Sequence, residues 1–178
     1  MSDTLTFKFK QVFADENDFL TFLTSYGVKD SPLSNEDSAF GKYLFKILNR
    51  RFYNSDIQYD TPTDFYFSLA ETIENIFNKY KKNKTLIDAI TALTADDLAI
   101  IGENLMNASD NPNNKPNDVR AQLDYITQQN WTMATTNKMQ AYLTAVDSMP
   151  DMQIDNICRE CAKHFKSVYV GAKYFYER

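Results

Sequence analysis

Apolar and polar side chains alternate only near the N-terminus, in TLTFKFKQVF (residues 4–13). Leu5, Phe7 and Phe9 fall on one side of an extended chain, and the residues between them fall on the other. A period of two is typical of a half-buried strand. The pattern therefore predicts a strand over residues 4–13. After this strand the apolar residues recur at the longer spacing of a helix.

Two helices are predicted next. Asp15 is a good N-cap for the first, and Gly27 is a good residue to end it. After a polar, proline-containing link, the second helix covers about residues 36–52, with apolar residues at helical spacing and arginines in its last turn. Beyond it, Ile57 and Tyr59 indicate a brief extended piece.

The third helix has the clearest start in the chain. Thr61 suits the N-cap, Pro62 suits the first helical position because its missing N–H needs no partner there, and Asp64 follows in the first turn. The apolar residues that come next form one continuous stripe: Phe65, Leu69, Ile73, Ile76, Phe77 and Tyr80. A lysine cluster over residues 79–84 ends the helix, where the dipole favours cations; phosphate contact is the alternative interpretation.

The second half of the chain is less regular. Residues 85–106 predict one or two short helices, or a helix with some strand. Residues 107–118 are almost wholly polar and contain two prolines, which predicts an exposed loop or mobile arm. Residues 122–138 mix β-branched and aromatic side chains with amides and are predicted to be extended, with Trp131 facing a partner. A final helical region is predicted over about residues 136–170.

Composition favours helices. The chain has 178 residues, enough for one domain with a core, and its four glycines and five prolines are few for a turn-dense sandwich. We therefore expect a mainly α fold, a helical bundle with minor β and an extended polar arm or hairpin over residues 107–138. Residues 1–178 are expected to form a single connector-like domain.

Charge and targeting signals narrow the function classes. The net charge is −5 and no broad basic face is evident, so binding of nucleic acid through its phosphates is not expected. The N-terminal MSDTLTFKFK lacks the apolar core of a signal peptide, and no apolar run approaches about 18 residues, so no membrane segment is expected. Two cysteines three residues apart do not indicate a disulfide framework. These features predict synthesis in a reducing cytoplasm.

Candidate chemistry is sparse. Cys158, Cys161 and His164 form a C-x2-C-x2-H pattern, but ligands at these spacings converge poorly on one helix, and structural zinc needs four. A nucleophile would have to pair Cys161 with His164, the single histidine. The paired carboxylates are expected to act as helix caps and solvated neighbours: Asp15–Glu16, Glu71–Glu74 and Asp96–Asp97. We expect no enzyme activity, no metal and no cofactor.

The run from Leu48 to Lys82 resembles a block of the lower collar, or head-to-tail connector, proteins of short-tailed bacteriophages; a smaller neck ring protein, as in crAss-like phages, matches equally well. In that family a pair of aromatics ends one helix, a short piece of pattern xIxY/F-[ED]-T follows, and a capped aromatic helix comes next. The matching residues here are Arg51, Phe52, Tyr53, Ile57, Tyr59, Asp60, Thr61, Phe65, Leu69, Ile76 and Tyr80. The resemblance covers about two thirds of the chain, and outside this block it is only compositional. The N-terminal strand and the short length depart from the larger relatives.

The resemblance implies a structural virion protein of the phage neck, made in the host cytoplasm. Such proteins form homododecameric rings that join the portal protein to the tail or to further ring proteins, with DNA only as passing cargo. An acidic balance suits such a conduit, because DNA phosphates must slide past the lumen without adhering.

We expect residues 51–69 to form an elbow that orients the third helix and presents part of a subunit–subunit face. The candidate interface residues are all aromatic: Phe52, Tyr53, Tyr59, Phe65, Tyr66 and Trp131. Two other interpretations stay open. One is a small cytoplasmic helical binding or phage assembly-chaperone protein, and the other is an enzyme that uses carboxylate chemistry.

Overall fold

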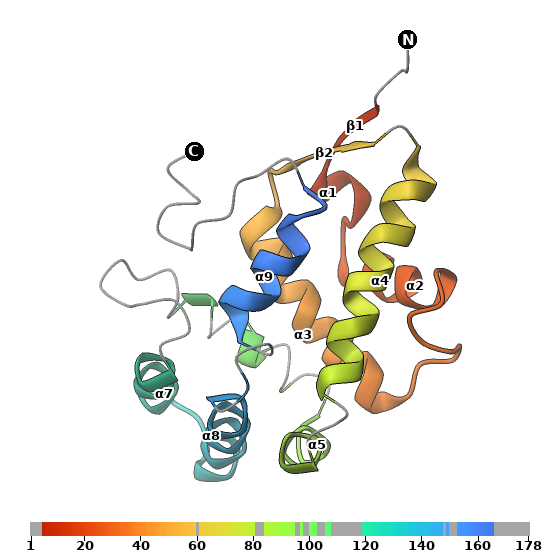
Figure 1. Ribbon diagram of the computed structural model, residues 1–178. Coiled ribbons are helices and arrows are strands. Elements are labelled where there is room, and N and C mark those ends of the chain that lie inside the picture. The colour runs from red at the N-terminus through yellow and green to blue at the C-terminus, as the bar shows by residue number, and fades with distance from the viewer. Residues whose placement is uncertain are drawn as a thin grey trace.

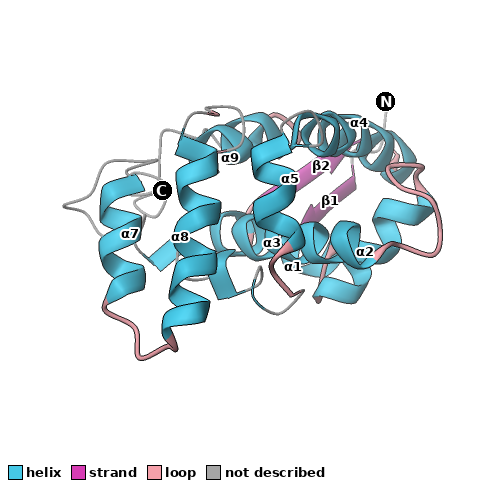
Figure 2. Cartoon of the chain, turned by 90° about the horizontal axis from the view of Figure 1, so that it is seen from below, coloured by secondary structure: helices cyan, strands magenta, loops and turns pink. Residues whose placement is uncertain are grey.

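The computed structural model gives a mainly helical protein with a small two-stranded antiparallel sheet, as the sequence predicts. It describes residues 5–59, 61–80, 84–94, 97, 100–102, 106–107, 119–147, 149 and 153–165. Within them the elements are β1 (Leu5–Lys8), α1 (Phe9–Val12), α2 (Glu16–Ser25), α3 (Asn35–Phe52), β2 (Asp56–Tyr59), α4 (Pro62–Tyr80), α5 (Lys84–Thr91), α7 (Val119–Thr127), α8 (Met133–Asp147) and α9 (Ile154–Ala162). Figures 1 and 2 show α2 and α4 at one side of the molecule and α7 and α8 at the other.

The predicted N-terminal strand exists but is shorter than expected. β1 pairs with β2 in antiparallel register, with Phe7 opposite Ile57, and ends at Lys8. Residues 9–12 form α1 instead of more strand. The physical reason is that β2 begins only at Asp56, so the chain after Lys8 has no strand left to pair with. The N–H groups of Phe9 and Lys10 donate instead to the carbonyl oxygens of Ser55 and Tyr53, in the turn before β2.

The predicted helix starts are confirmed. The Asp15 side chain accepts a hydrogen bond from the Asp18 backbone N–H at 2.9 Å, and the Thr61 hydroxyl accepts one from the Asp64 N–H at 3.2 Å. Gly27, just beyond α2, has φ +76°, a left-handed conformation that glycine adopts without steric cost. The short polar signals around α2 and α4 therefore specify where these helices begin and end.

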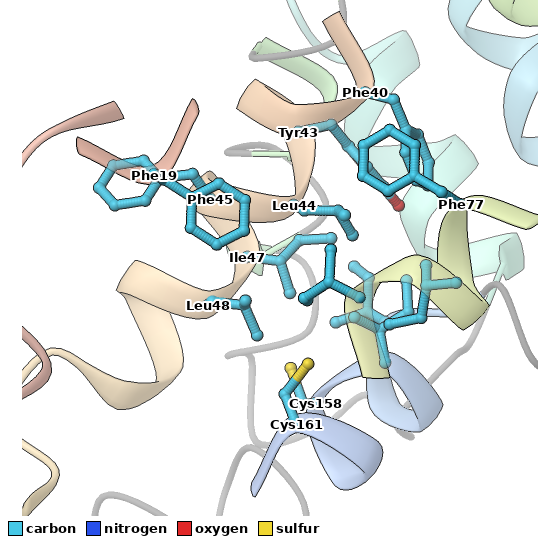
Figure 3. Close-up of a cluster of buried hydrophobic side chains, with 14 of the residues drawn as sticks. Phe19, Phe40, Tyr43, Leu44, Phe45, Ile47, Leu48, Phe77, Cys158 and Cys161 are labelled. Carbon is cyan, nitrogen blue, oxygen red and sulfur yellow. The ribbon is translucent and has the colours of Figure 1, made fainter. Parts of the chain in front are cut away.

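α3 is the central helix of the core. Its apolar side chains point in two directions: Phe45 packs near Phe19 of α2, and Phe40 meets Phe77 of α4 edge to face with centroids 5.0 Å apart (Figure 3). On the α2 side, a Cβ at Gly41 would lie 2.7 Å from a Leu20 methyl, so any larger residue here would require the Leu20 side chain to shift.

A second cluster joins the ends of the chain. The Phe165 ring, just after α9, lies 4.7 Å from Phe52 at the end of α3 and 5.6 Å from Phe9 in α1. It also lies 6.3 Å from Phe65 in α4. All four rings are buried. This phenylalanine cluster holds four elements that are far apart in sequence.

The prediction that residues 122–138 are extended is wrong. The predicted arm over residues 107–138 is therefore also wrong for this part of the chain. α7 and α8 occupy these residues, with a turn between them. Ile126 is fully buried, and so are Met139 and Leu143 at helical spacing, so packing overrides the β-propensity of the segment. Thr132 caps the start of α8, because its hydroxyl accepts a hydrogen bond from the Thr135 N–H. The sequence prediction did not recognise this cap.

The segment before α7 is described in part. α5 confirms a short helix at the start of residues 85–106. Asn107 accepts a 2.7 Å hydrogen bond from the Arg50 guanidinium, whereas residues 108–118 of the predicted arm lie outside the described residues. In the part of the chain that the structure describes, no helix is long and apolar enough to cross a bilayer.

The phenylalanine cluster makes a stability prediction. Because Phe65 is buried against Phe13 and Phe165, Phe65→Ala should lower the free energy of unfolding by about 3–5 kcal/mol, measured by urea denaturation. Met133 in α8, 79% exposed, serves as the control, and Met133→Ala should change the free energy by less than about 0.5 kcal/mol. Equal losses for the two variants would contradict the assignment of Phe65 to the core.

Candidate functional site

The structure divides the six predicted interface residues into buried and accessible side chains. Phe52 and Phe65 are buried within the chain, where they belong to the phenylalanine cluster. Their rings therefore orient α4 relative to α3 and have no surface to offer a partner. Tyr59 pairs with Leu5 through the backbone of the sheet, and its side chain lies outside the described residues.

The other three predicted residues do not form one site. Tyr53 is 47% exposed, and the Lys10 ammonium lies 5.1 Å from the centre of its ring. Trp131 is half-buried in the turn between α7 and α8, where it packs against the core. Tyr66 lies on α4, on the side that faces α2. The sequence predicted Tyr53 and Tyr66 in the elbow and Trp131 beside the polar arm, and the structure gives each of the three a different set of neighbours.

Tyr66 instead joins two aromatic residues that the sequence analysis did not select. Its ring stacks on Tyr26 at the end of α2, with centroids 4.9 Å apart and planes 24° apart. Phe67 stands edge-on to Tyr26, with centroids 5.3 Å apart. Tyr26 and Tyr66 are partly exposed and Phe67 largely exposed. The sequence does indicate an exposed ring at Phe67, because this aromatic residue falls outside the apolar stripe of α4.

The two segments that carry these rings contain charged residues of one sign. Every charged side chain between Gln11 and Val28 is acidic, and so is every one between Tyr53 and Asn78. Burial raises the pKa of Tyr66, and the neighbouring Tyr26 and the Asp18 carboxylate raise it further. We call this surface the aromatic–acidic face; it comprises Tyr26, Tyr66 and Phe67 with the exposed carboxylates Asp18, Asp64, Glu71 and Glu74.

The cysteine and histidine pattern of α9 lies in the packing between α9, α3 and α4. Both thiols are buried and point toward the side chains of α3 (Figure 3). Burial raises the pKa of the Cys161 thiol well above its ordinary value, which is the opposite of what a nucleophile or a metal thiolate requires. His164 Nε2 lies 2.7 Å from the Thr72 hydroxyl and so joins α9 to α4. Searching the described residues reveals no metal-binding group of three or more potential ligands.

The described carboxylates of the candidate pairs behave as caps or surface groups. Asp97 and Thr94 cap each other, since each side chain accepts a hydrogen bond from the other's backbone N–H at 2.9 and 3.1 Å. Glu71 and Glu74 are exposed on α4, and Asp96 lies outside the described residues. The capping role expected for Asp15 and Asp97 is confirmed.

Comparison with protein-family models, with curated proteins and with solved structures found no match to this chain. The aromatic–acidic face is therefore the surface that bears most directly on function.

The burial of the cysteines predicts low reactivity. In the native protein a thiol-specific reagent such as dithionitrobenzoate should label Cys158 and Cys161 only as fast as the fold opens, because both thiols are enclosed and the Cys161 thiolate is disfavoured. Stopped-flow absorbance, recorded with and without denaturant, measures the rate of labelling. Immediate labelling of either thiol in the native protein would contradict it.

His164 predicts a pH dependence of stability. Burial lowers its pKa from the ordinary 6.5 and Lys163 lowers it further, while Glu160 and Glu71 act in the opposite direction. The unfolded state therefore binds a proton more readily, so the free energy of unfolding should fall as pH drops below about 6.5. Because the chain has one histidine, urea denaturation of the wild type and of His164→Gln at pH 5–8 isolates the effect. Parallel pH profiles would show that His164 is not responsible.

Proposed function

We propose that this protein is a structural component of a phage neck, a ring that joins the portal to the tail and lets DNA pass, without a catalytic role. The observation that carries the proposal is the aromatic–acidic face. Stacked and edge-on rings at the surface offer stiff apolar contact area, which is typical of protein–protein interfaces. A face of this kind favours assembly over chemistry.

The charge of the face favours a ring over a two-fold dimer. In a two-fold dimer the same patch meets itself, so Asp18, Glu71 and Glu74 of one copy would lie against the same carboxylates of the other. Like charges placed together across an interface cost several kcal/mol. A contact with a different face of the next copy avoids this repulsion, and such head-to-tail contacts generate closed rings when the rotation closes.

The family-like block is also consistent with this proposal. Residues 48–82, which carry the resemblance, include the end of α3, β2 and α4. The buried rings of Phe52 and Phe65 fix the angle between α3 and α4, and the outer side of α4 carries Phe67. The block that resembles the connector proteins is thus the block that positions the face.

The remaining features of the proposal follow from the resemblance. The expected assembly is a homododecamer that contacts the portal protein on one side and tail or further ring proteins on the other, within the virion. The net charge of −5 suits a passage through which DNA moves without adhering.

Native mass measurement and negative-stain imaging of the purified protein, alone and with a portal protein, test the proposal. We expect annular particles of about twelve copies for a ring of this family, formed alone or on the portal. A monomer or dimer that neither assembles nor binds the portal would exclude the ring and leave a small helical binding or assembly-chaperone protein as the better interpretation.

A further inference from the structure

The aromatic–acidic face needs a basic complement, and this chain carries one on α3. Lys42, Lys46 and Arg50 are spaced four residues apart, which places them in one row along the helix. Lys42 and Lys46 are partly exposed, and the guanidinium of the exposed Arg50 donates a 2.7 Å hydrogen bond to Asn107 Oδ1 within the same chain. We call these three residues the basic row.

The basic row lies away from the aromatic–acidic face. Gly41 turns toward Leu20 and Leu23 of α2, so that side of α3 is covered by α2. The segment at Gly102 approaches a different side of α3, because a Cβ there would lie 3.1 Å from the Lys46 Cβ. The two surfaces therefore point in different directions within one subunit. Because the Gly102 segment packs against the base of Lys46, the row offers a neighbouring copy the partly exposed side chains of Lys42 and Lys46.

We propose that the aromatic–acidic face of one copy docks onto the basic row of a second copy, head to tail. This inference rests on the proposed ring and specifies which surfaces form its subunit contact. A lysine side chain would lie over the exposed ring of Phe67, with its ammonium group near Glu71 and Glu74. An exposed aromatic ring attracts a cation, and the neighbouring carboxylates balance the positive charge of the lysine.

The chemistry of the two surfaces favours a second copy of this chain as the partner of the aromatic–acidic face. An acidic partner surface would meet like charge at the face, and a purely apolar one would leave the carboxylates without counter-charges. A second copy supplies both the cations and the methylene stems of lysine, which cover apolar surface while the charge stays at the rim. Since the contact uses exposed charges, rising salt should weaken the assembly.

The test uses two full-length variants that each lose one surface. Phe67→Ala/Glu74→Gln alters the aromatic–acidic face, and Lys42→Glu/Lys46→Glu alters the basic row, so that the two altered surfaces do not attract each other. All four positions are exposed or partly exposed, and circular dichroism and thermal unfolding verify that each variant folds. The single substitutions Phe67→Ser and Lys46→Glu serve as a milder pair if a double variant fails to fold.

Each variant alone should remain monomeric under conditions in which the wild type assembles, as measured by light scattering or native mass spectrometry. Mixed together, they should form a 1:1 heterodimer and nothing larger, because one intact face and one intact row meet while the altered surfaces block further growth. A two-fold contact in which the aromatic–acidic face meets itself does not give this pattern, because the basic-row variant would then dimerise alone.

Matched control variants carry the same kinds of change on α5, α7 and α8. Met133→Ala/Asp124→Asn removes an exposed apolar side chain and neutralises a carboxylate, and Lys84→Glu/Lys138→Glu reverses two lysines. Both controls should assemble like the wild type.

Three results would overturn the inference. If the wild type forms rings and both surface variants still do, the contact lies elsewhere and the ring proposal stands. If only the aromatic–acidic variant fails to assemble, the partner of that face is not the basic row. If the wild type stays monomeric with and without a portal, the ring proposal fails and this contact fails with it.

Discussion

The packing of four phenylalanine rings from distant parts of the chain is the constraint on which the rest of the structure depends. Phe165 brings the end of α9 against α1, the end of α3 and the start of α4, through Phe9, Phe52 and Phe65. Burying large aromatic side chains contributes more than any single hydrogen bond in this region, because the apolar area removed from water is large. The two-strand sheet alone would be marginal, so the cluster also holds β1 against β2.

The orientation of α4 follows from this cluster and determines what reaches the surface. Its inner stripe is apolar and buried, while Phe67, Glu71 and Glu74 face outward. With Tyr26 and Tyr66, that outer side becomes an aromatic surface of one charge sign. A surface of one sign cannot pair with itself, and this physical restriction is what favours a head-to-tail assembly over a dimer.

The residues that suggested chemistry have structural roles in the described part of the chain. The Cys161 thiol is buried with a raised pKa, His164 links α9 to α4 through Thr72, and Asp97 caps a helix. Each of these side chains has a defined role in packing or capping. The sequence motif C-x2-C-x2-H therefore reflects the buried side of an amphipathic helix that ends at a helix–helix contact.

The sequence by itself determined the helix boundaries around α2 and α4, the buried stripe of α4, and the mainly helical class, because caps, prolines and apolar periods act over a few residues. Only the tertiary structure decided that residues 9–12 leave the strand, that residues 122–138 are helical, and that Phe52 and Phe65 are core residues. It also decided that Tyr26 meets Tyr66 and Phe67, two rings forty residues further along the chain. The physical reason is that strand length depends on the partner strand, β-propensity yields to packing, and burial depends on neighbours that are distant in sequence.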